Sequence, residues 1–302
     1  MEFLYFLEGI RNPFLDQVML LITHLGEETV FLVAALIMLW CVDKRKGYYL
    51  LTVGFVGTIA SQFMKLWFRI PRPWVLDENF TIVEAARAEA GGYSFPSGHS
   101  QSSVGTFGSI AASVNKKWIR IPSIALAVLV PLSRMYLGVH TPADVLVGAA
   151  ISVVLIFGFR PLVLRNTDRN LPALLLVMTL LSGAYLAFIH LYRFPVDIDP
   201  ANLHSGTQNA YTLMGSLLGF LVVYIVDRKW LNFSLDAVWW AQILKLILGL
   251  LIVLAVKSGL KVPLNMLCGE LFGRMIRYFF VVLTAGVVWP LTFKWFARLG
   301  RP

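Results

Sequence analysis

The sequence predicts an all-α, polytopic membrane protein built as a helical bundle, and its composition and the pattern of its apolar residues both support that fold class. Of its 302 residues, 58% are hydrophobic and only 14% are charged, whereas a soluble domain carries about 25% charged residues. The apolar residues fall into repeated runs long enough for a helix to cross a bilayer, not into the short alternating segments of a membrane β-barrel. Because a helix satisfies its own backbone hydrogen bonds inside lipid, these runs predict spanning helices.

Six crossings are expected in the first half of the chain. The N-terminal apolar stretch is broken at Asn12-Pro13, which predicts a short, partly interfacial helix followed by a first spanning segment. The other five crossings are expected near residues 29–42, 47–68, 97–114, 121–138 and 142–159. A polar loop over residues 69–95 separates the third crossing from the fourth.

Four further crossings are expected near residues 171–191, 211–226, 238–256 and 275–296, which gives about ten in total. A linking segment at residues 160–171 contains Pro, Asn and Asp and is a plausible boundary between two parts of the chain. Residues 1–160 form the predicted six-helix core. Residues 161–302 form additional transmembrane helices, to which the sequence assigns no role.

Basic loops predict the orientation of the helices. Clusters such as Lys44-Arg45-Lys46, Lys116-Lys117 and Arg228-Lys229 fall on one face if the crossings alternate, and basic loops of this kind stay on the cytoplasmic side. The net charge of +9 therefore reflects membrane topology, and nucleic acid is not expected as a partner. The sequence leaves the oligomeric state open.

The cysteines and the N-terminus give no indication of a disulfide, a structural metal site or a cleaved signal peptide. Cys41 and Cys268 are expected at opposite membrane faces, so we expect no disulfide between them. No Cys or His spacing indicates a structural metal site. The first residues lack the basic start and the small-residue cleavage site of a secretory signal peptide, so we expect none to be removed.

Ionisable residues recur at helix ends on the non-cytoplasmic face, where an apolar chain should avoid them. They lie in three short segments, residues 65–72, 96–99 and 133–144. An ionisable side chain at membrane depth costs at least about 2.5–3.5 kcal/mol, so such residues are candidates for a functional site. Cations on this face also run against the positive-inside rule, which indicates a role other than topology.

The segment Pro96-Ser97-Gly98-His99 directly precedes a helix rich in small residues. Proline suits the first turn of a helix, and glycine lets a ligand approach the backbone closely. Free N–H groups at the positive end of the helix favour a bound anion. Taken alone, the segment is also compatible with an ordinary helix start.

The segment Thr141-Pro142-Ala143-Asp144 predicts a second helix start, with His140 directly before it. One helical turn separates His140 from Asp144, so the carboxylate can hold one imidazole nitrogen and leave the other free as a nucleophile. The alternative is that Asp144 only caps its helix and that His140 is a loop residue.

Three cations, Lys65, Arg72 and Arg134, accompany these helix starts. Arg134 lies near the end of an apolar run, where an arginine either snorkels to the interface or binds a phosphate with its planar fork. Each cation alone is commonplace. Their combination with two histidines and an aspartate, in this order and at these spacings, is not explained by composition.

In combination, these residues resemble the signatures of the type 2 phosphatidic acid phosphatase superfamily of lipid phosphatases. The first signature is a lysine followed after six residues by Arg-Pro, and the second is Pro-Ser-Gly-His. The third is Ser-Arg, five residues, a histidine, three residues and an aspartate. All three are complete, and the resemblance covers about residues 1–160. It implies a membrane-embedded six-helix core with its site at one membrane face.

The resemblance also implies a mechanism, namely metal-independent phosphoryl transfer through a phosphohistidine without a cofactor. His140 is the expected nucleophile, Asp144 orients it, and His99 is the expected general acid. The expected phosphate ligands are Lys65, Arg72, Ser97, Gly98 and Arg134.

We therefore expect a hydrolase of lipid phosphates or diphosphates in the cell membrane, with its site on the non-cytoplasmic side. A polyprenyl diphosphate or a glycerolipid phosphate is the favoured substrate. The alternatives are a phosphotransferase that passes the group to an alcohol, and a lipid transporter with a vestigial site. In the second part of the chain, Arg274 and Arg277 begin the last crossing from the outer side and can contact a lipid headgroup.

Overall fold

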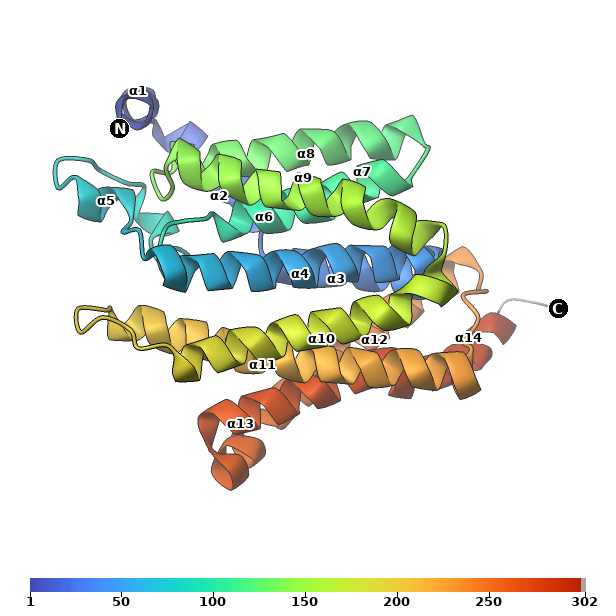
Figure 1. Ribbon diagram of the computed structural model, residues 1–302. Helices are drawn as coiled ribbons and strands as arrows, with labels where there is room; N and C mark the ends of the chain where they lie inside the picture. The colour runs from blue at the N-terminus through green and yellow to red at the C-terminus, as the bar shows by residue number, and fades with distance from the viewer. Residues whose placement is uncertain (300–302) are drawn as a thin grey trace. The chain divides into compact units, whose positions relative to one another are not determined.

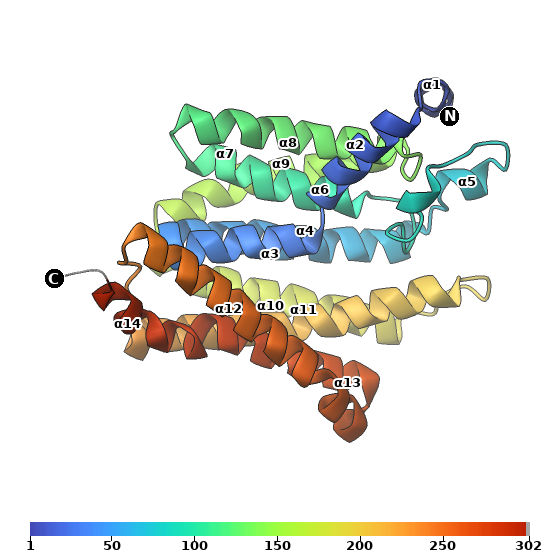
Figure 2. The same cartoon turned by 180° about the vertical axis from the view of Figure 1, so that it is seen from behind.

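The computed structural model describes residues 1–299, and every regular element among them is helical. Figures 1 and 2 show these helices from two opposite sides. In chain order the α-helices are α1 (Glu2–Gly9), α2 (Pro13–His24), α3 (Glu28–Ile37), α4 (Lys44–Phe68), α5 (Pro73–Leu76), α6 (Gly98–Ser103), α7 (Ser109–Ser113), α8 (Lys117–Tyr136), α9 (Pro142–Leu164), α10 (Thr167–Leu191), α11 (Pro200–Val226), α12 (Trp239–Gly259), α13 (Lys261–Leu283) and α14 (Phe293–Arg298). A π-helical turn at Met38–Val42 prolongs α3, and another at Val104–Gly108 joins α6 to α7.

Seven helices in the described part of the chain are long and apolar enough to cross a membrane, namely α4 and α8 to α13. Helix α2 and the prolonged helix α3 form a pair bent by 50°, which makes an eighth span if the two are taken together. The predicted fold class, an all-α polytopic membrane bundle, is confirmed.

The number of long spans is lower than the expected ten or so, for two reasons. The first two expected crossings are the two arms of the bent pair, Pro13–His24 and Glu28–Val42. The crossing expected at residues 97–114 is the continuous helical stretch α6–α7, over residues 98–113. At 1.5 Å per residue this stretch is about 24 Å long, which is shorter than a hydrocarbon core of about 30 Å.

The chain divides into two compact units that do not follow a single boundary in the sequence. The first unit comprises Met1–Ala34, Tyr49–Pro161 and Arg193–Gly206. The second comprises Ala35–Tyr48, Leu162–Tyr192 and the residues from Thr207 on. All the site residues expected from the sequence belong to the first unit.

Close helix packing in the first unit brings two helix starts together. Helix α8 packs against α1, α2 and the α6–α7 stretch. A Cβ atom at Gly148 of α9 would lie only 2.5 Å from the carbonyl oxygen of Ser97, so the absence of a side chain permits this approach. The backbone N–H of Ser97 donates to the carbonyl oxygen of Asp144 at 2.9 Å. The N-terminal ends of α6 and α9 therefore lie side by side.

The outward faces of the long helices are apolar. On α9, for example, Leu146, Val154 and Phe157 expose 67%, 70% and 63% of their surface. Large exposed apolar faces of this kind mark contact with lipid or another partner. Together with the length of the helices, they indicate a multi-pass protein whose solvent is the bilayer.

In the second unit, α12 packs against α13. The π-helical turn after α3 is attached to the C-terminal helices, because the Trp40 indole N–H donates to the carbonyl oxygen of Ala285 at 3.0 Å. Lys44 forms an ion pair of 2.9 Å with Asp227, and its ammonium lies 3.5 Å from the centre of the Phe233 ring. The indole hydrogen bond and the mostly buried Lys44–Asp227 ion pair therefore link the segment after α3 to the later helices of this unit.

Candidate active site

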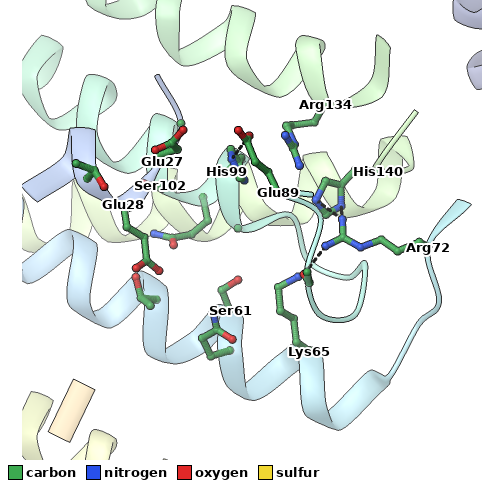
Figure 3. Close-up of a pocket in the computed structure, with 17 residues that line it drawn as sticks. Glu27, Glu28, Ser61, Lys65, Arg72, Glu89, His99, Ser102, Arg134 and His140 are labelled. Carbon is green, nitrogen blue, oxygen red and sulfur yellow. Dashed lines mark hydrogen bonds and ion pairs between the residues drawn. The ribbon is translucent and has the colours of Figure 1, made fainter. Parts of the chain in front are cut away.

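A pocket of about 380 Å³ in the first unit contains most of the site residues expected from the sequence. It is lined by residues from the α2–α3 connection, α4, the loop before α6, α6 itself and the C-terminal end of α8. Figure 3 shows the cations and both histidines directed toward this space from separate elements. The expected residues that line it are Lys65, Arg72, Gly98, His99, Arg134 and His140.

The three cations of the pocket are buried and held in place by oxygen acceptors. Lys65 and Arg72 are 8% and 7% exposed, and Arg134 is completely buried. Lys65 Nζ donates to the carbonyl oxygen of Tyr93. Arg72 donates to three backbone carbonyls of the loops around it, those of Gly91, Gly92 and Val139.

Arg134 is only partly satisfied by the protein. Its Nη1 donates to Thr23 Oγ1 at 2.7 Å, whereas Nε and Nη2 are buried without a hydrogen-bond partner. Buried donors of a guanidinium group need acceptors, and a phosphate offers several at the geometry of the fork. The expectation that Arg134 snorkels to the interface does not fit a fully buried side chain.

His140 presents one nitrogen to the pocket and the other to a carboxylate. Arg72 Nη1 lies 2.9 Å from His140 Nε2 and 3.5 Å from Nδ1, so the shorter contact of this donor is with Nε2. Nδ1 also lies 3.5 Å from Asp144 Oδ2 and 3.4 Å from Ser94 Oγ, and the nearby carboxylate favours the tautomer that carries its proton on Nδ1. This arrangement leaves the Nε2 lone pair facing the cations of the pocket, as a nucleophile requires.

The surroundings of His140 favour its neutral form. Burial lowers the pKa of its imidazole well below the ordinary value of 6.5, and the positive charges of Arg72, Arg134 and Lys65 lower it further. A neutral imidazole keeps the lone pair that attack on phosphorus needs.

Asp144 both caps its helix and orients the imidazole, so the two interpretations left open by the sequence apply together. The Asp144 N–H donates to Thr141 Oγ1 at 3.3 Å, and the Thr141 N–H donates to Asp144 Oδ2 at 2.7 Å, which is a reciprocal capping box. Ser94 Oγ donates to the same carboxylate oxygen at 2.6 Å. Asp144 lies behind His140 and is 1% exposed.

Of the two expected ligands in the Pro-Ser-Gly-His segment, one lines the pocket and one does not. Ser97 Oγ caps α6, where it accepts hydrogen bonds from the N–H of Ser100 at 3.3 Å and from its hydroxyl at 2.9 Å. Ser97 is fully buried and is not part of the pocket lining. Gly98 does line the pocket, and a Cβ atom added there would meet no atom within 4 Å.

Acidic residues at the pocket are a feature that the sequence motifs did not predict. Glu89 Oε2 lies 3.9 Å from His99 Nε2 (Figure 3). Glu89 Oε1 lies 3.0 Å from His24 Nδ1. Glu27 Oε1 contacts the same His24 nitrogen at 2.7 Å. Burial and, after it, the positive charges of the three pocket cations lower the pKa of His99 to about 2. A carboxylate beside the ring acts in the opposite direction, because it favours the protonated form.

His24, Glu27 and Glu89 are also the one group in the described part of the chain that could hold a cation. One ligand atom from each lies within 4.8 Å of the others. In the structure these atoms instead contact one another as histidine–carboxylate pairs.

Two family models match the chain. The model described as the PAP2 superfamily matches residues 45–168, which include every signature residue named above. The model described as PAP2 superfamily phosphatase, transmembrane extension, matches residues 211–301. The similarity to known families therefore extends beyond about residue 160, where the resemblance described from the signatures ends.

Several curated proteins are similar to the chain. Phosphatidylglycerophosphatase B of Bacillus subtilis is 33% identical over 161 residues, covering 49% of this chain and 75% of that protein. Undecaprenyl-diphosphatase of Sulfolobus acidocaldarius is 30% identical over 135 residues, covering 44% of this chain and 64% of that protein. Sphingosine-1-phosphate phosphatase 1 of Mus musculus is 24% identical over 264 residues, covering 79% of this chain and 58% of that protein. No solved structure matches.

Proposed function

Because the chain belongs to the PAP2 superfamily and is a lipid phosphatase of that type, we propose that it transfers the phosphoryl group of its substrate to His140 and then to water. The observation that carries this proposal is the position of His140 Nε2, which faces the cationic pocket while Nδ1 faces Asp144. We further propose that the site opens on the non-cytoplasmic side of the membrane and that the reaction needs no metal ion.

In the first step, His140 Nε2 attacks phosphorus and a P–N bond forms as the bond to the leaving oxygen breaks. The entering phosphate competes with Nε2 for the N–H of Arg72 and so frees the lone pair. His99 gives its proton to the leaving oxygen, and Glu89, 3.9 Å from His99 Nε2, favours the protonated imidazole before transfer. Asp144 stabilises the charge that His140 acquires.

In the second step, water attacks the phosphohistidine. His99, now neutral, accepts a proton from the water as the P–N bond breaks, and inorganic phosphate leaves with His99 protonated again. Lys65, Arg72 and Arg134 hold the equatorial oxygens in both steps, together with the Gly98 N–H. Three fixed cations supply the positive charge that a metal ion supplies in other phosphoryl-transfer sites, which is the reason for proposing a metal-independent reaction.

A lipid substrate fits the surroundings of the pocket. The long helices of the first unit expose apolar faces to the bilayer, where the hydrocarbon chain of a substrate resides. The names of the similar proteins cover a glycerolipid phosphate, a polyprenyl diphosphate and a sphingoid phosphate. We propose a polyprenyl diphosphate or a glycerolipid phosphate as the substrate, because one phosphatidylglycerophosphatase and two undecaprenyl-diphosphatases are among the similar proteins.

Phosphate release from a panel of lipids by the purified protein tests this proposal. The wild type should release phosphate from one lipid class, and His140→Ala should reduce release to background and yield no acid-labile phosphoenzyme. His190→Ala is the matched control, because His190 contacts Tyr211 in the second unit and lies outside the pocket. Substantial turnover by His140→Ala would contradict the assignment of the nucleophile, and loss of activity in a chelator would contradict the metal-free reaction.

The same assay separates the two alternative functions. A phosphotransferase would form a new phosphoester when an alcohol is supplied, and it would release little free phosphate. A transporter with a vestigial site would move lipid between leaflets even after the His140→Ala substitution.

A further inference from the structure

The first part of α13, in the second unit, folds back on the helix that follows it. Gly269 has φ 76° and ψ 169°, a conformation that breaks the helix and favours glycine. A Cβ atom at Gly273 would lie 2.7 Å from the carbonyl oxygen of Leu264 and 2.9 Å from the N–H nitrogen of Asn265. Residues 261–268 therefore pack directly against the turns after Gly269, as the hairpin at α13 in Figures 1 and 2 shows.

Two arginines follow this hairpin on one side of the helix. Arg274 and Arg277 are three residues apart, a spacing that places side chains next to each other on a helix surface. Arg277 is only 5% exposed. The Nε atoms of both arginines are buried without a hydrogen-bond partner, and within residues 1–299 neither arginine makes an ion pair.

The neighbourhood of Arg277 adds positive charge. Its guanidinium carbon lies 5.4 Å from the centre of the Tyr278 ring, and Lys257 Nζ of α12 lies 5.9 Å from the centre of the same ring. Three cations therefore share one region of the second unit. A buried guanidinium without an ion-pair partner is unfavourable, so a bound anion would stabilise this region.

Asn265 supplies the complementary group. The Oδ1 atom of Asn265 is buried and accepts no hydrogen bond. The backbone of Asn265 packs against Gly273, which lies one position before Arg274 and one helical turn before Arg277. The hairpin thus combines unsatisfied guanidinium donors with an unsatisfied acceptor. A phosphate ester whose headgroup carries a hydroxyl would satisfy both.

The apolar surface of the hairpin indicates that this phosphate belongs to a lipid. Val262, Met266 and Leu267 expose 63%, 81% and 79% of their surface. Large apolar side chains beside a set of cations are typical of a segment at the bilayer interface, where acyl chains contact the former and headgroups the latter.

We propose that Arg274, Arg277 and Asn265 form a second, non-catalytic site for the phosphate headgroup of an anionic membrane lipid with a free hydroxyl. The proposed catalytic pocket binds a phosphate in order to transfer it, whereas α13 itself carries no histidine comparable to His140. The site in α13 therefore retains its lipid intact and goes beyond the phosphatase activity proposed above.

Thermal unfolding of the full chain in nanodiscs tests this site. Wild-type protein should unfold at a higher temperature in discs that contain phosphatidylglycerol than in discs of phosphatidylcholine alone, since a ligand of the native state stabilises it. Arg277→Gln and Arg274→Gln should lose most of that shift. Native mass spectrometry should show at least about tenfold weaker retention of phosphatidylglycerol, as expected when charge-assisted hydrogen bonds are lost.

Three controls make the result specific. Arg298→Gln removes an equal charge from an exposed position of the same unit and should keep the full shift. Arg277→Lys retains the charge but not the fork and should keep only part of it. Wild type and His140→Ala should respond alike, because the site is independent of the catalytic pocket.

The comparison is made between two lipids for each variant, so a change in baseline stability does not obscure it. If Arg274→Gln and Arg277→Gln both respond to phosphatidylglycerol as the wild type does, the proposal is wrong. The proposal of a lipid site is also wrong if inorganic phosphate, added to phosphatidylcholine discs, gives the wild type the same shift and gives Arg277→Gln none. That outcome would identify a site for free phosphate instead.

Discussion

At the scale of single residues, one carboxylate oxygen takes part both in the cap of a helix and in the surroundings of His140, the proposed nucleophile. Asp144 Oδ2 receives the Ser94 hydroxyl at 2.6 Å and the Thr141 N–H at 2.7 Å, and it faces His140 Nδ1 at 3.5 Å. Ser94 lies 3.4 Å from the same Nδ1 and is fully buried. We therefore assign Ser94 as a positioning residue that holds both members of the His140–Asp144 pair.

Replacing Ser94 by Ala should lower kcat about tenfold or more, because a hydrogen bond to a charged group contributes about 1.5–3 kcal/mol. KM should change little, since Ser94 does not line the pocket. Steady-state kinetics with the preferred lipid measure both quantities. Ser113→Ala is the matched control, because its hydroxyl only contacts the carbonyl oxygen of Ile110 within α7. A rise in KM at unchanged kcat would contradict a positioning role.

The pH dependence of the reaction should reflect a neutral His140. Its pKa is lowered well below 6.5 by burial and by the nearby cations, so the imidazole loses its proton at a lower pH than usual. The nucleophile should then remain available as the pH falls from about 7.5 to 6, and kcat/KM should not show an acidic limb from His140 in that range. The substrate phosphate itself ionises near pH 6. Its ionised fraction at each pH is measured by phosphorus NMR, and kcat/KM is corrected for that fraction. A remaining acidic limb at about pH 6.5 would show that His140 titrates normally.

At the scale of helices, the close approach of α9 to the start of α6 determines the geometry of the site. Gly148 is the contact point, because its missing Cβ would lie 2.5 Å from the carbonyl oxygen of Ser97, a backbone atom that cannot rotate away. The close approach of the helix that carries Asp144 to the turn before His99 therefore depends on the absence of a side chain at Gly148.

Gly148→Ala should separate these two helix ends and reduce both stability and activity. We expect a loss of about 1–3 kcal/mol in the free energy of unfolding, as for other overpacked interior positions, and a larger relative loss of kcat. Gly158→Ala on the same helix is the control, because a Cβ there would meet no atom within 4 Å. That substitution should be neutral or slightly stabilising, since alanine favours a helix by about 0.5–1 kcal/mol relative to glycine. Equal behaviour of the two variants would contradict the role of Gly148.

The helices and the signature motifs were predictable from the sequence, whereas the loop partners were not. Apolar runs identified α4, α8 to α12 and the later part of α13, because a long hydrophobic stretch has few other structures available in a bilayer. The first part of α13, from Lys261 to Cys268, was expected to lie outside a crossing. The bend between α2 and α3 was not predicted. Hydropathy alone does not distinguish two separate crossings from two short helices that together form one bent span. Ser94 and Glu89 come from an irregular loop without periodicity, and only the fold brings them to His140 and His99.

At the scale of the whole molecule, the two units contribute differently. The first contains all the residues proposed for phosphoryl transfer. The second contains most of the segment that matches the transmembrane extension model, together with the cationic cluster on α13. A core that performs chemistry is thus accompanied by a unit that we propose to bind lipid, and the two activities can be tested separately.

The proposed orientation of the first unit leads to a labelling prediction. Helix α5 and the start of α8 lie at opposite ends of this unit in Figure 1. Glu78, two residues after α5, and Lys117, the first residue of α8, are both exposed. In a chain lacking Cys41 and Cys268, Glu78→Cys should react with a membrane-impermeant maleimide in intact cells. Lys117→Cys should react with the same reagent only after the cell membrane has been permeabilised. The reverse pattern would place the catalytic pocket on the cytoplasmic side.

The contact between Arg72 and His140 bears on which substrates would engage the proposed nucleophile. The guanidinium of Arg72 lies 2.9 Å from Nε2, so a group that needs Nε2 must also accommodate this arginine. A strongly anionic phosphate would attract the guanidinium to its own oxygens, whereas an uncharged ester would not. In the proposed reaction, discrimination by charge would therefore begin at the atom that attacks.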